Sequence, residues 1–195
     1  MSNSGQLIIL SGPSGAGKST VLRRLIETCP LPLELSVSVT TREKRVGEVD
    51  GRDYYFVSHE KFQQMREDGE FLECKEVFGR GDWYGTPASR VEAALNDGKW
   101  LILEIDVQGA MSVLEKRPDA LTFFVHPGSL EELEIRLRRR GTDDEAAVMR
   151  RLEVAADELK ALGKYRYEII NRDVELTVVE ICQLLQQNPV GVKHA

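Results

Sequence analysis

The sequence predicts an α/β fold in which a parallel sheet is sandwiched between helices. Short apolar runs typical of buried strands alternate with amphipathic segments typical of helices over most of the 195 residues. Strands that alternate with helices form a parallel sheet that is covered on both faces. Between about residues 37 and 95 the pattern changes to short alternating segments separated by glycine turns, which predicts an inserted mixed α+β lobe.

Each expected element follows from a local pattern. An apolar run predicts a strand over 7–10, and the following amphipathic segment, which "CPLPL" ends, predicts a helix over 18–28. Within the lobe we expect extended segments at 34–39, 53–57 and 70–77 and a helix at 59–68. Afterwards we expect strands at 100–105, 121–125 and 167–170, and helices at 86–97, 107–116, 129–140, 145–162 and 174–187.

The composition limits the classes of function. The formal net charge of −6 argues against a general nucleic-acid binder, which is usually basic. No apolar run approaches the roughly 20 residues that a membrane helix needs, and the N-terminus lacks the basic region of a signal peptide. We therefore expect a cytoplasmic protein without a membrane partner. Cys29, Cys74 and Cys182 show no paired spacing and are expected to be free thiols.

The segment 12–19, "GPSGAGKS", fits the pattern G-x-x-x-x-G-K-[ST] and lies between an expected strand and an expected helix. Its glycines let backbone N–H groups curl around phosphate oxygens, and the helix N-terminus adds partial positive charge. Lys18 can reach the β- and γ-phosphates, and the Ser19 hydroxyl can ligate Mg²⁺. The sequence therefore predicts a P-loop NTPase fold. The expected ATP-binding residues of the loop are Gly12, Pro13, Ser14, Gly15, Ala16, Gly17, Lys18, Ser19 and Thr20.

A GTPase is one alternative for such a loop. The segment 106–109, "DVQG", matches the D-x-x-G of many GTPases, but this pattern has only two fixed positions. A GTPase also needs a guanine-reading N-K-x-D late in the chain, and the sequence contains none.

The inserted lobe carries the groups that a nucleoside monophosphate needs. Arg42 and Arg45 offer forked donors for a phosphate, with Tyr54 following. Glu73 offers a carboxylate that can accept from the N–H groups of guanine, and Thr86 adds a hydroxyl. A solvated charged hairpin would explain some of these charges but not the whole combination.

With these motifs the chain resembles the guanylate kinases, most closely the bacterial enzymes, from about Gln6 to about Leu185. The segments that carry the resemblance are "GPSGAGKST", "SVSVTTR..R.GE..G.DY.F", "F.E...V.G", "YGT", "EID.QG", "RL..RG" and "IIN". The resemblance implies direct in-line transfer of the γ-phosphoryl group of ATP to GMP, giving ADP and GDP, with Mg²⁺ as the cofactor. The attacking phosphate oxygen is already anionic, so positioning and positive charge suffice without a general base.

The resemblance also assigns roles by position. It places the GMP phosphate at Arg42, Arg45, Tyr54 and Tyr84, and guanine at Ser38, Glu73 and Thr86, with Asp106 nearby. It places Glu104 close to the metal, directly or through water, and Asn171 near adenine. It implies that the catalytic groups are Lys18, Arg45 and the lid arginines Arg136, Arg140 and Arg151. Because strand side chains alternate, we also expect Glu104 and Asp106 to project from one side of their strand.

The expected division is a core of residues 1–36, 96–128 and 156–195, a GMP-binding lobe of 37–95 and a helical lid of 129–155. Arg136 and Arg140 are four residues apart and share one helix face, and Gly141 follows as a joint. A lid that excludes water would prevent wasteful ATP hydrolysis.

Two departures and two rival functions stay open. The link at 79–83 is longer than expected, and Arg172 stands where an acid is expected after Asn171. A scaffold module of the same family would typically lose the phosphate loop or lid arginines, and a sugar-phosphate kinase would not need Ser38, Glu73 and Thr86. The sequence also leaves the oligomeric state and the use of dGMP undecided.

Overall fold

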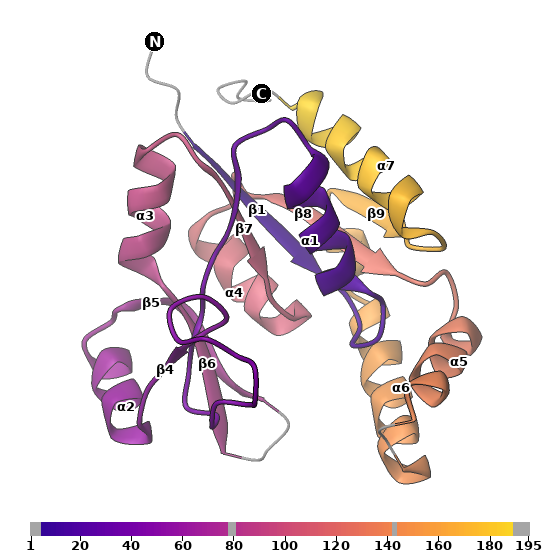
Figure 1. Ribbon diagram of the computed structural model, residues 1–195, viewed down its shortest axis with the longest axis horizontal. Helices are drawn as coiled ribbons and strands as arrows, with labels where there is room; N and C mark the ends of the chain where they lie inside the picture. The colour runs from indigo at the N-terminus through magenta and orange to yellow at the C-terminus, as the bar shows by residue number, and fades with distance from the viewer. Residues whose placement is uncertain (1–4, 78–80, 142–143, 189–195) are drawn as a thin grey trace.

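The computed structural model describes residues 5–77, 81–141 and 144–188, and a five-stranded parallel sheet forms the centre of this part of the chain (Figure 1). Its strands run in the order β2-β7-β1-β8-β9, and every pairing between neighbours is parallel. They are β1 (Gln6–Ser11), β2 (Leu33–Leu35), β7 (Trp100–Glu104), β8 (Leu121–His126) and β9 (Tyr167–Ile170). The predicted α/β fold is therefore confirmed.

Helices cover both faces of this sheet because β1 is apolar on both sides. Ile8 and Leu10 pack against helices α1 and α7, whereas Leu7 and Ile9 pack on the opposite face against α3 and α4 (Figure 1). The helices that flank the sheet are α1 (Lys18–Thr28), α3 (Ala88–Asn96), α4 (Val107–Lys116) and α7 (Val174–Gln186). Two separate apolar layers thus fix the sheet between two pairs of helices.

A second, mixed sheet forms the inserted lobe. Its strands run in the order β4-β3-β6-β5, with β3 parallel to β4 and the other pairings antiparallel. The elements of the lobe are β3 (Val39–Thr40), β4 (Tyr55–Phe56), α2 (His59–Glu67), β5 (Phe71–Val77) and β6 (Asp82–Pro87). Phe62 of α2 stacks on Phe71 with ring centroids 4.6 Å apart, and both are buried. The lobe therefore has a small apolar core of its own.

Two further helices, α5 (Leu130–Arg140) and α6 (Glu145–Leu159), project beyond the sheet across from the inserted lobe, at the lower right of Figure 1. Leu133 and Leu137 of α5 pack with Val148 of α6 in a separate buried cluster. The α5 helix ends at Gly141, whose φ of 65° is a left-handed conformation that favours glycine. The side chain of Asp144 caps α6 by accepting from the N–H of Ala147 at 2.7 Å.

Two expected helix bounds differ from the structure by more than one residue. The helix expected from residue 86 begins at Ala88, because Thr86 continues β6 and pairs with Glu73 of β5. Pro87 caps this helix. The helix expected to reach residue 162 ends at Leu159, and a short 3₁₀ turn over Leu162–Lys164 follows. In both cases the residues in question belong to a neighbouring element: residues 86 and 87 belong to β6, and residue 162 belongs to the 3₁₀ turn.

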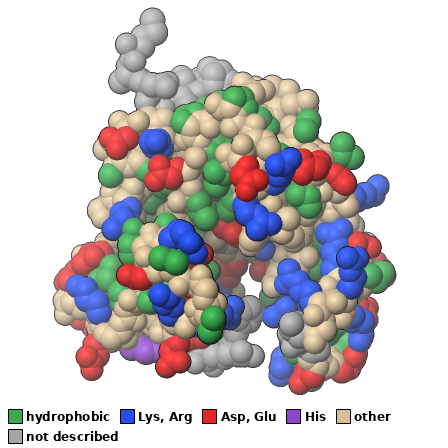
Figure 2. Space-filling view, in the orientation of Figure 1, with side chains coloured by type: hydrophobic (Ala, Val, Ile, Leu, Met, Phe, Trp, Pro, Cys, Tyr) green, Lys and Arg blue, Asp and Glu red, His purple; other side chains and the backbone are tan. Residues whose placement is uncertain are grey.

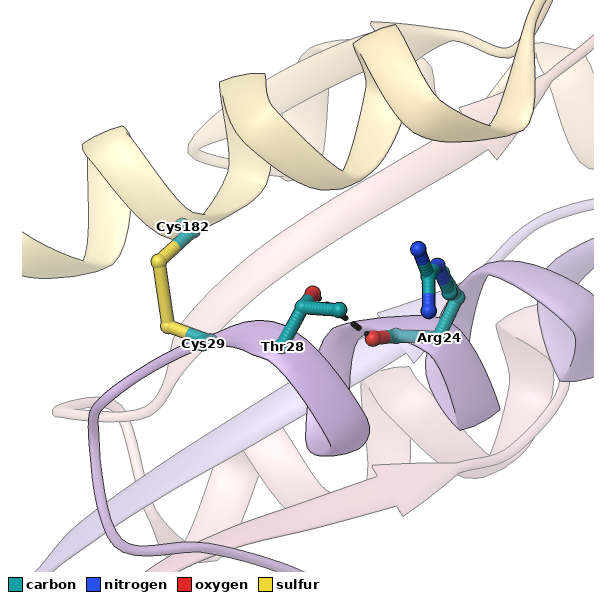
Figure 3. The surroundings of a disulfide bond; sticks show 4 residues. All are labelled: Arg24, Thr28, Cys29 and Cys182. Carbon is teal, nitrogen blue, oxygen red and sulfur yellow. Dashed lines mark hydrogen bonds between the residues drawn. A yellow bond between two sulfur atoms is a disulfide. The ribbon is translucent and has the colours of Figure 1, made fainter.

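Cys29 and Cys182 form a disulfide, so the expectation of free thiols is wrong for these two residues (Figure 3). Cys29 lies at the C-terminal end of α1 and Cys182 on α7, with Cα atoms 5.9 Å apart. The two cysteines are 153 residues apart in sequence, and only the packing of α1 on α7 brings them together. Cys74 is a free, half-buried thiol.

Two expectations concern residues near the gaps in the description. Part of the lengthened link at 79–83 lies outside the described residues, as do residues 142–143 of the expected lid. Among the described helices, none combines the length and the apolar character that a membrane crossing requires.

Candidate active site

The expected site residues gather where the parallel strands end. The phosphate loop follows β1, Glu104 ends β7, and Asn171 follows β9. Because parallel strands point the same way, these residues meet at the carboxyl edge of the sheet. The loop leaves the central strand β1 and passes close to its neighbour β8, where Gly12 lies against the backbone of Val125.

Two glycines of the loop have no room for a side chain. A Cβ on Gly12 would lie 2.0 Å from the backbone oxygen of Val125 in β8, and Gly12 has a φ of 130°. A Cβ on Gly17 would lie 2.6 Å from the side-chain nitrogen of Asn171, and Gly17 has a φ of 89°. Glycine is thus needed at both positions for close approach as well as for the turn. Gly17 caps α1, which starts at Lys18.

The ammonium group of Lys18 lies over its own loop. It donates to the backbone oxygens of Gly12 at 2.6 Å and Pro13 at 3.0 Å. Burial lowers the pKa of Lys18, and the nearby carboxylates of Glu104, Glu158 and Asp106 oppose that shift. A lysine in this position is a fixed positive charge for phosphate oxygens.

Ser19 and Glu104 meet beside the loop. The Ser19 hydroxyl donates to Oε1 of Glu104 at 2.6 Å, so the first turn of α1 and the end of β7 are directly linked. Both residues line a hollow of about 200 Å³, whose lining is Ser14, Gly15, Gly17, Lys18, Ser19, Thr20, Glu104 and Arg140. A hydroxyl and a carboxylate are hard oxygen donors of the kind that Mg²⁺ prefers. The donor set therefore fits the expected metal.

Asn171 braces the loop from the side of β9. Its side-chain nitrogen donates to the backbone oxygen of Ala16 at 2.8 Å, and its side-chain oxygen accepts from the Thr177 hydroxyl at 3.2 Å. The residue is buried, and both ends of its amide have protein partners. The side chain of Asn171 therefore links the phosphate loop to the start of α7.

The lid arginines point to different places. Arg140 lines the hollow of the phosphate loop. Arg136 bonds to Glu132 at 2.8 Å and to the backbone oxygen of Asn171 at 2.8 Å. A second hollow of about 350 Å³ is lined by Pro127, Gly128, Ser129, Glu132, Arg136 and Arg172. Arg151 is half-buried on α6.

The lobe presents an arginine held among aromatic rings. Arg42 donates from Nε to the Tyr84 hydroxyl at 3.1 Å and pairs through Nη2 with Glu48 at 2.7 Å. Its guanidinium lies 5.5 Å from the ring centre of Tyr54. Glu48 also accepts from the backbone N–H of Arg45 at 2.8 Å, and the Arg45 side chain is exposed. Burial raises the pKa of the Tyr54 hydroxyl, so it stays a protonated donor.

Glu73 and Thr86, two further residues expected in the site, lie opposite each other on β5 and β6. The Thr86 hydroxyl donates to Oε1 of Glu73 at 2.6 Å, and both side chains are buried. Burial raises the pKa of Glu73, whereas the hydrogen bond from Thr86 lowers it. Ser38 is half-buried next to β3, and its backbone oxygen accepts from Tyr55.

The expectation that Asp106 projects from the same strand as Glu104 is wrong, because β7 ends at Glu104. Asp106 instead caps α4: Oδ1 accepts from the N–H of Gly109 at 2.9 Å. Its other oxygen, Oδ2, pairs with Nζ of Lys75, which also donates to Oε1 of Gln108 at 3.3 Å. The start of α4 thereby contacts the lobe.

Three charged residues of the site carry no expected role in the sequence. Lys75 pairs with Asp106 and Glu48 pairs with Arg42. From the sequence alone, a charged residue on a hairpin is expected to be exposed to solvent, so neither pairing was predicted. Glu158 is half-buried on α6, and burial raises its pKa to about 7, with Lys18, Asp106 and Lys75 nearby. Glu48 meets Arg42 and Arg45 within one loop, whereas Lys75 and Glu158 meet groups that are distant in the sequence, so their spacing gives no signal.

Figure 2 shows the lobe and the two-helix lid as separate projections with a gap between them, and lysine and arginine side chains border the lid side. A phosphate loop therefore shares this side of the molecule with a lobe that presents Arg42 among the rings of Tyr54 and Tyr84. This arrangement defines a phosphate-loop kinase whose acceptor is a small phosphorylated molecule, the class of the nucleoside monophosphate kinases.

Comparison with known proteins gives the family. The family model described as guanylate kinase matches residues 4–188. The chain is 58% identical over 184 residues to the guanylate kinase of Rhodopirellula baltica, covering 93% of this chain and 87% of that protein. It is 47% identical to that of Rubrobacter xylanophilus, covering 96% of each. A crystal structure of guanylate kinase from Anaplasma phagocytophilum aligns with a TM-score of 0.77 at 37% identity, covering 97% of this chain and 89% of that one. The chain belongs to the guanylate kinase family.

Proposed function

We propose that the phosphate loop holds ATP and that the inserted lobe holds GMP, so that the two halves of one site face each other. The chain is a nucleoside monophosphate kinase that phosphorylates GMP to GDP with ATP as the donor. The observation that carries the assignment of residues is the pairing of β5 with β6. Glu73 is opposite Thr86, and Tyr84 lies two residues earlier on the same strand, so all three share one face.

That face offers different chemistry at its two ends. At one end Arg42 and Tyr84 supply donors that suit a phosphate, and Tyr54 lies beside them. At the other end the Glu73 carboxylate can accept from the N1–H and N2–H groups of guanine, and Thr86 holds it in place. Ser38 lies on the segment that leads into this sheet and is proposed to contact the base. Exposed Arg45 is proposed to reach the phosphate when the lobe closes.

Phosphoryl transfer to GMP needs charge neutralisation more than it needs a base. The nucleophile is a phosphate oxygen that is anionic near neutral pH, and the barrier includes repulsion between two anionic nucleotides. Lys18 and Arg140 lie at the same hollow, on the core and on the lid respectively. We propose that they stabilise the transferring group in an in-line reaction, with Arg151 and Arg136 approaching from the lid.

Mg²⁺ would be held by the Ser19 hydroxyl and, directly or through water, by Glu104. When bound with ATP, it supplies positive charge between the phosphates. Ser19 and Glu104 already lie 2.6 Å apart, which fixes the orientation of both oxygen donors. The chain's own contribution is thus to position two oxygens beside the loop.

The second hollow, with Arg136 and Arg172 in its lining, is proposed to take the nucleoside end of ATP. Asn171 is then a positioning residue that connects this hollow to the loop, since its amide bonds to Ala16. We further propose that residues 37–95 and 129–155 move toward the core as lobe and lid, which would exclude water from the reaction. A cytoplasmic location is proposed because ATP and GMP are metabolites of that compartment.

The experiment is a coupled assay of ADP release. The protein is incubated with Mg²⁺-ATP and, in separate reactions, with GMP, AMP, UMP or ribose bisphosphate. Of the four acceptors, we expect only GMP to give rapid turnover. Turnover with ribose bisphosphate in place of GMP would favour a sugar-phosphate kinase, and no turnover with any acceptor would favour a binding module.

A further inference from the structure

Lys75 lies on the same face of the lobe as the residues assigned to GMP. In the register of β5 and β6 it is directly opposite Tyr84, and two residues earlier Glu73 is opposite Thr86. Residues opposite each other in an antiparallel pair, and residues two apart on a strand, project from the same side of a sheet. Lys75 therefore lies beside Tyr84 at the proposed phosphate end of this face, next to the pair Glu73 and Thr86 at the proposed base end.

The Lys75 side chain crosses from the lobe to the core. Its ammonium group contacts Oδ2 of Asp106, the residue that caps α4, and Oε1 of Gln108 in the first turn of that helix. At the C-terminal end of α4 the donor comes from the helix instead: Lys116 donates to the backbone oxygen of Leu72 in β5. The strand that carries Glu73 is thus attached to α4 on both sides of Glu73.

Two carboxylates converge at the point that Lys75 secures. A Cβ built on Gly109 would lie 3.1 Å from Oε2 of Glu73 and 3.3 Å from Oδ1 of Asp106. The two carboxylates thus approach the same point beside Gly109, and carboxylates so close repel each other unless a cation lies between or beside them. Lys75 is that cation for Asp106, with three-quarters of its side chain shielded from solvent.

We propose that Lys75 is a positioning residue for the acceptor nucleotide: by binding Asp106 and Gln108, it holds Glu73 at the place where a guanine base can be read. This inference rests on the proposed function of the lobe and adds a determinant of base selectivity. Without the cation, Asp106 repels Glu73 and β5 is free to move away from α4. Removal of the Lys75 charge therefore weakens the binding of GMP. It leaves the phosphate loop unchanged, because the described contacts of Lys75 are to Asp106 and Gln108 and not to residues of the loop.

The test compares Lys75→Met, which keeps the length of the side chain and removes its charge, with Lys75→Arg, which keeps the charge. A matched control is Lys61→Met, on the exposed surface of α2 in the same lobe. We expect Lys75→Met to raise the KM for GMP by about tenfold with less than about a twofold change in kcat and in the KM for ATP. We also expect a smaller preference for GMP over AMP, near-normal kinetics for Lys75→Arg and no change for Lys61→Met.

A double variant tests whether Lys75 acts through Asp106. Asp106→Asn removes the negative charge but keeps an oxygen that can cap Gly109. We therefore expect the additional effect of Lys75→Met to fall below about twofold in the Asp106→Asn background. Full additivity of the two changes would overturn the proposed route.

Calorimetry with GMP alone separates this inference from the proposed function. If the wild-type protein binds GMP and Lys75→Met weakens that binding while thermal unfolding stays cooperative, the inference holds even if turnover is absent. If the wild-type enzyme turns over GMP and Lys75→Met matches it in KM and in the Kd for GMP, the inference fails while the function stands. A loss in kcat alone, or an equal loss for ATP, would likewise overturn it.

Discussion

The Thr86 hydroxyl donates a hydrogen bond of 2.6 Å to Oε1 of Glu73, and the two residues face each other across β5 and β6. The bond leaves Oε2 of Glu73 beside Gly109, at the junction between the lobe and the core. A buried carboxylate with one oxygen fixed in this way presents its other oxygen in a defined direction. The pair therefore holds Oε2 of Glu73 as a fixed acceptor, which is the role toward the N–H groups of guanine that we propose for it.

Glu73→Gln keeps the shape of this side chain but replaces an acceptor by a donor. We expect kcat/KM for GMP to fall by about 100-fold and the Kd for ATP to change by less than about twofold, because only the base loses its partner. The control is Glu76→Gln on the same strand, where the carboxylate is exposed and accepts from the N–H of Gly81. Steady-state kinetics and calorimetry give both values, and an equal loss for both nucleotides would contradict the role of Glu73.

The sequence was sufficient to predict the sheet, the flanking helices and the loop, because these depend on local periodicity and on a motif of fixed spacing. The continuous apolar run from Leu7 to Leu10 already predicts a buried strand, and the structure confirms it, with side chains packed on both faces. Contacts between distant segments were not predictable. The pairing of Lys75 with Asp106, and the bond of Asn171 to the loop, depend on how elements pack rather than on any pattern along the chain.

Asn171→Ala tests whether the amide braces the phosphate loop. It leaves the backbone oxygen of Ala16 without its donor in a buried place, so we expect the free energy of unfolding to fall by about 2 kcal/mol. We also expect a higher KM for ATP with little change in the KM for GMP. Asn188→Ala is the control, because Asn188 bonds to Tyr167 and Leu184 at the end of α7. If both variants raise the KM for ATP equally, the effect is one of general stability and the bracing role is wrong.

Reduction of the disulfide between Cys29 and Cys182 is expected to destabilise the core without changing the site. The bond closes a loop of 153 residues and links α1 to α7, and such cross-links contribute about 2–4 kcal/mol. We expect a lower Tm in the presence of a thiol reductant and the same loss in Cys182→Ser, which should then be insensitive to the reductant. Mass spectrometry of peptides checks the pairing. Cys74→Ser should keep the full response to reductant, and a wild-type Tm that ignores the reductant would contradict the prediction.

Glu158→Gln should change how stability depends on pH. Burial raises the pKa of Glu158 to about 7, so the folded state holds a proton on it at pH values where the unfolded chain, with a pKa of 4.5, has released it. The wild-type protein therefore loses stability from this group as pH rises from about 4.5 to about 7, and the loss is complete above that window. A neutral glutamine does not pay this cost. Relative to the wild type, the variant should gain about 2 kcal/mol in the free energy of unfolding between pH 4.5 and pH 8, less than the roughly 3 kcal/mol of the full pKa shift because solvent screens a half-buried side chain.

The measurement is urea denaturation of both proteins at pH 4.5, 6, 7 and 8, with Glu153→Gln as the control on the exposed side of the same helix. The control should follow the wild type at every pH. Because Lys18 stabilises the charged form of Glu158, its removal raises the pKa of Glu158 further, so the gain from Glu158→Gln should be larger in the Lys18→Met background than in the wild type. Wild-type and Glu158→Gln curves that stay parallel over the whole range would show that Glu158 ionises as an ordinary surface carboxylate, and its packing against the loop would then not control its charge.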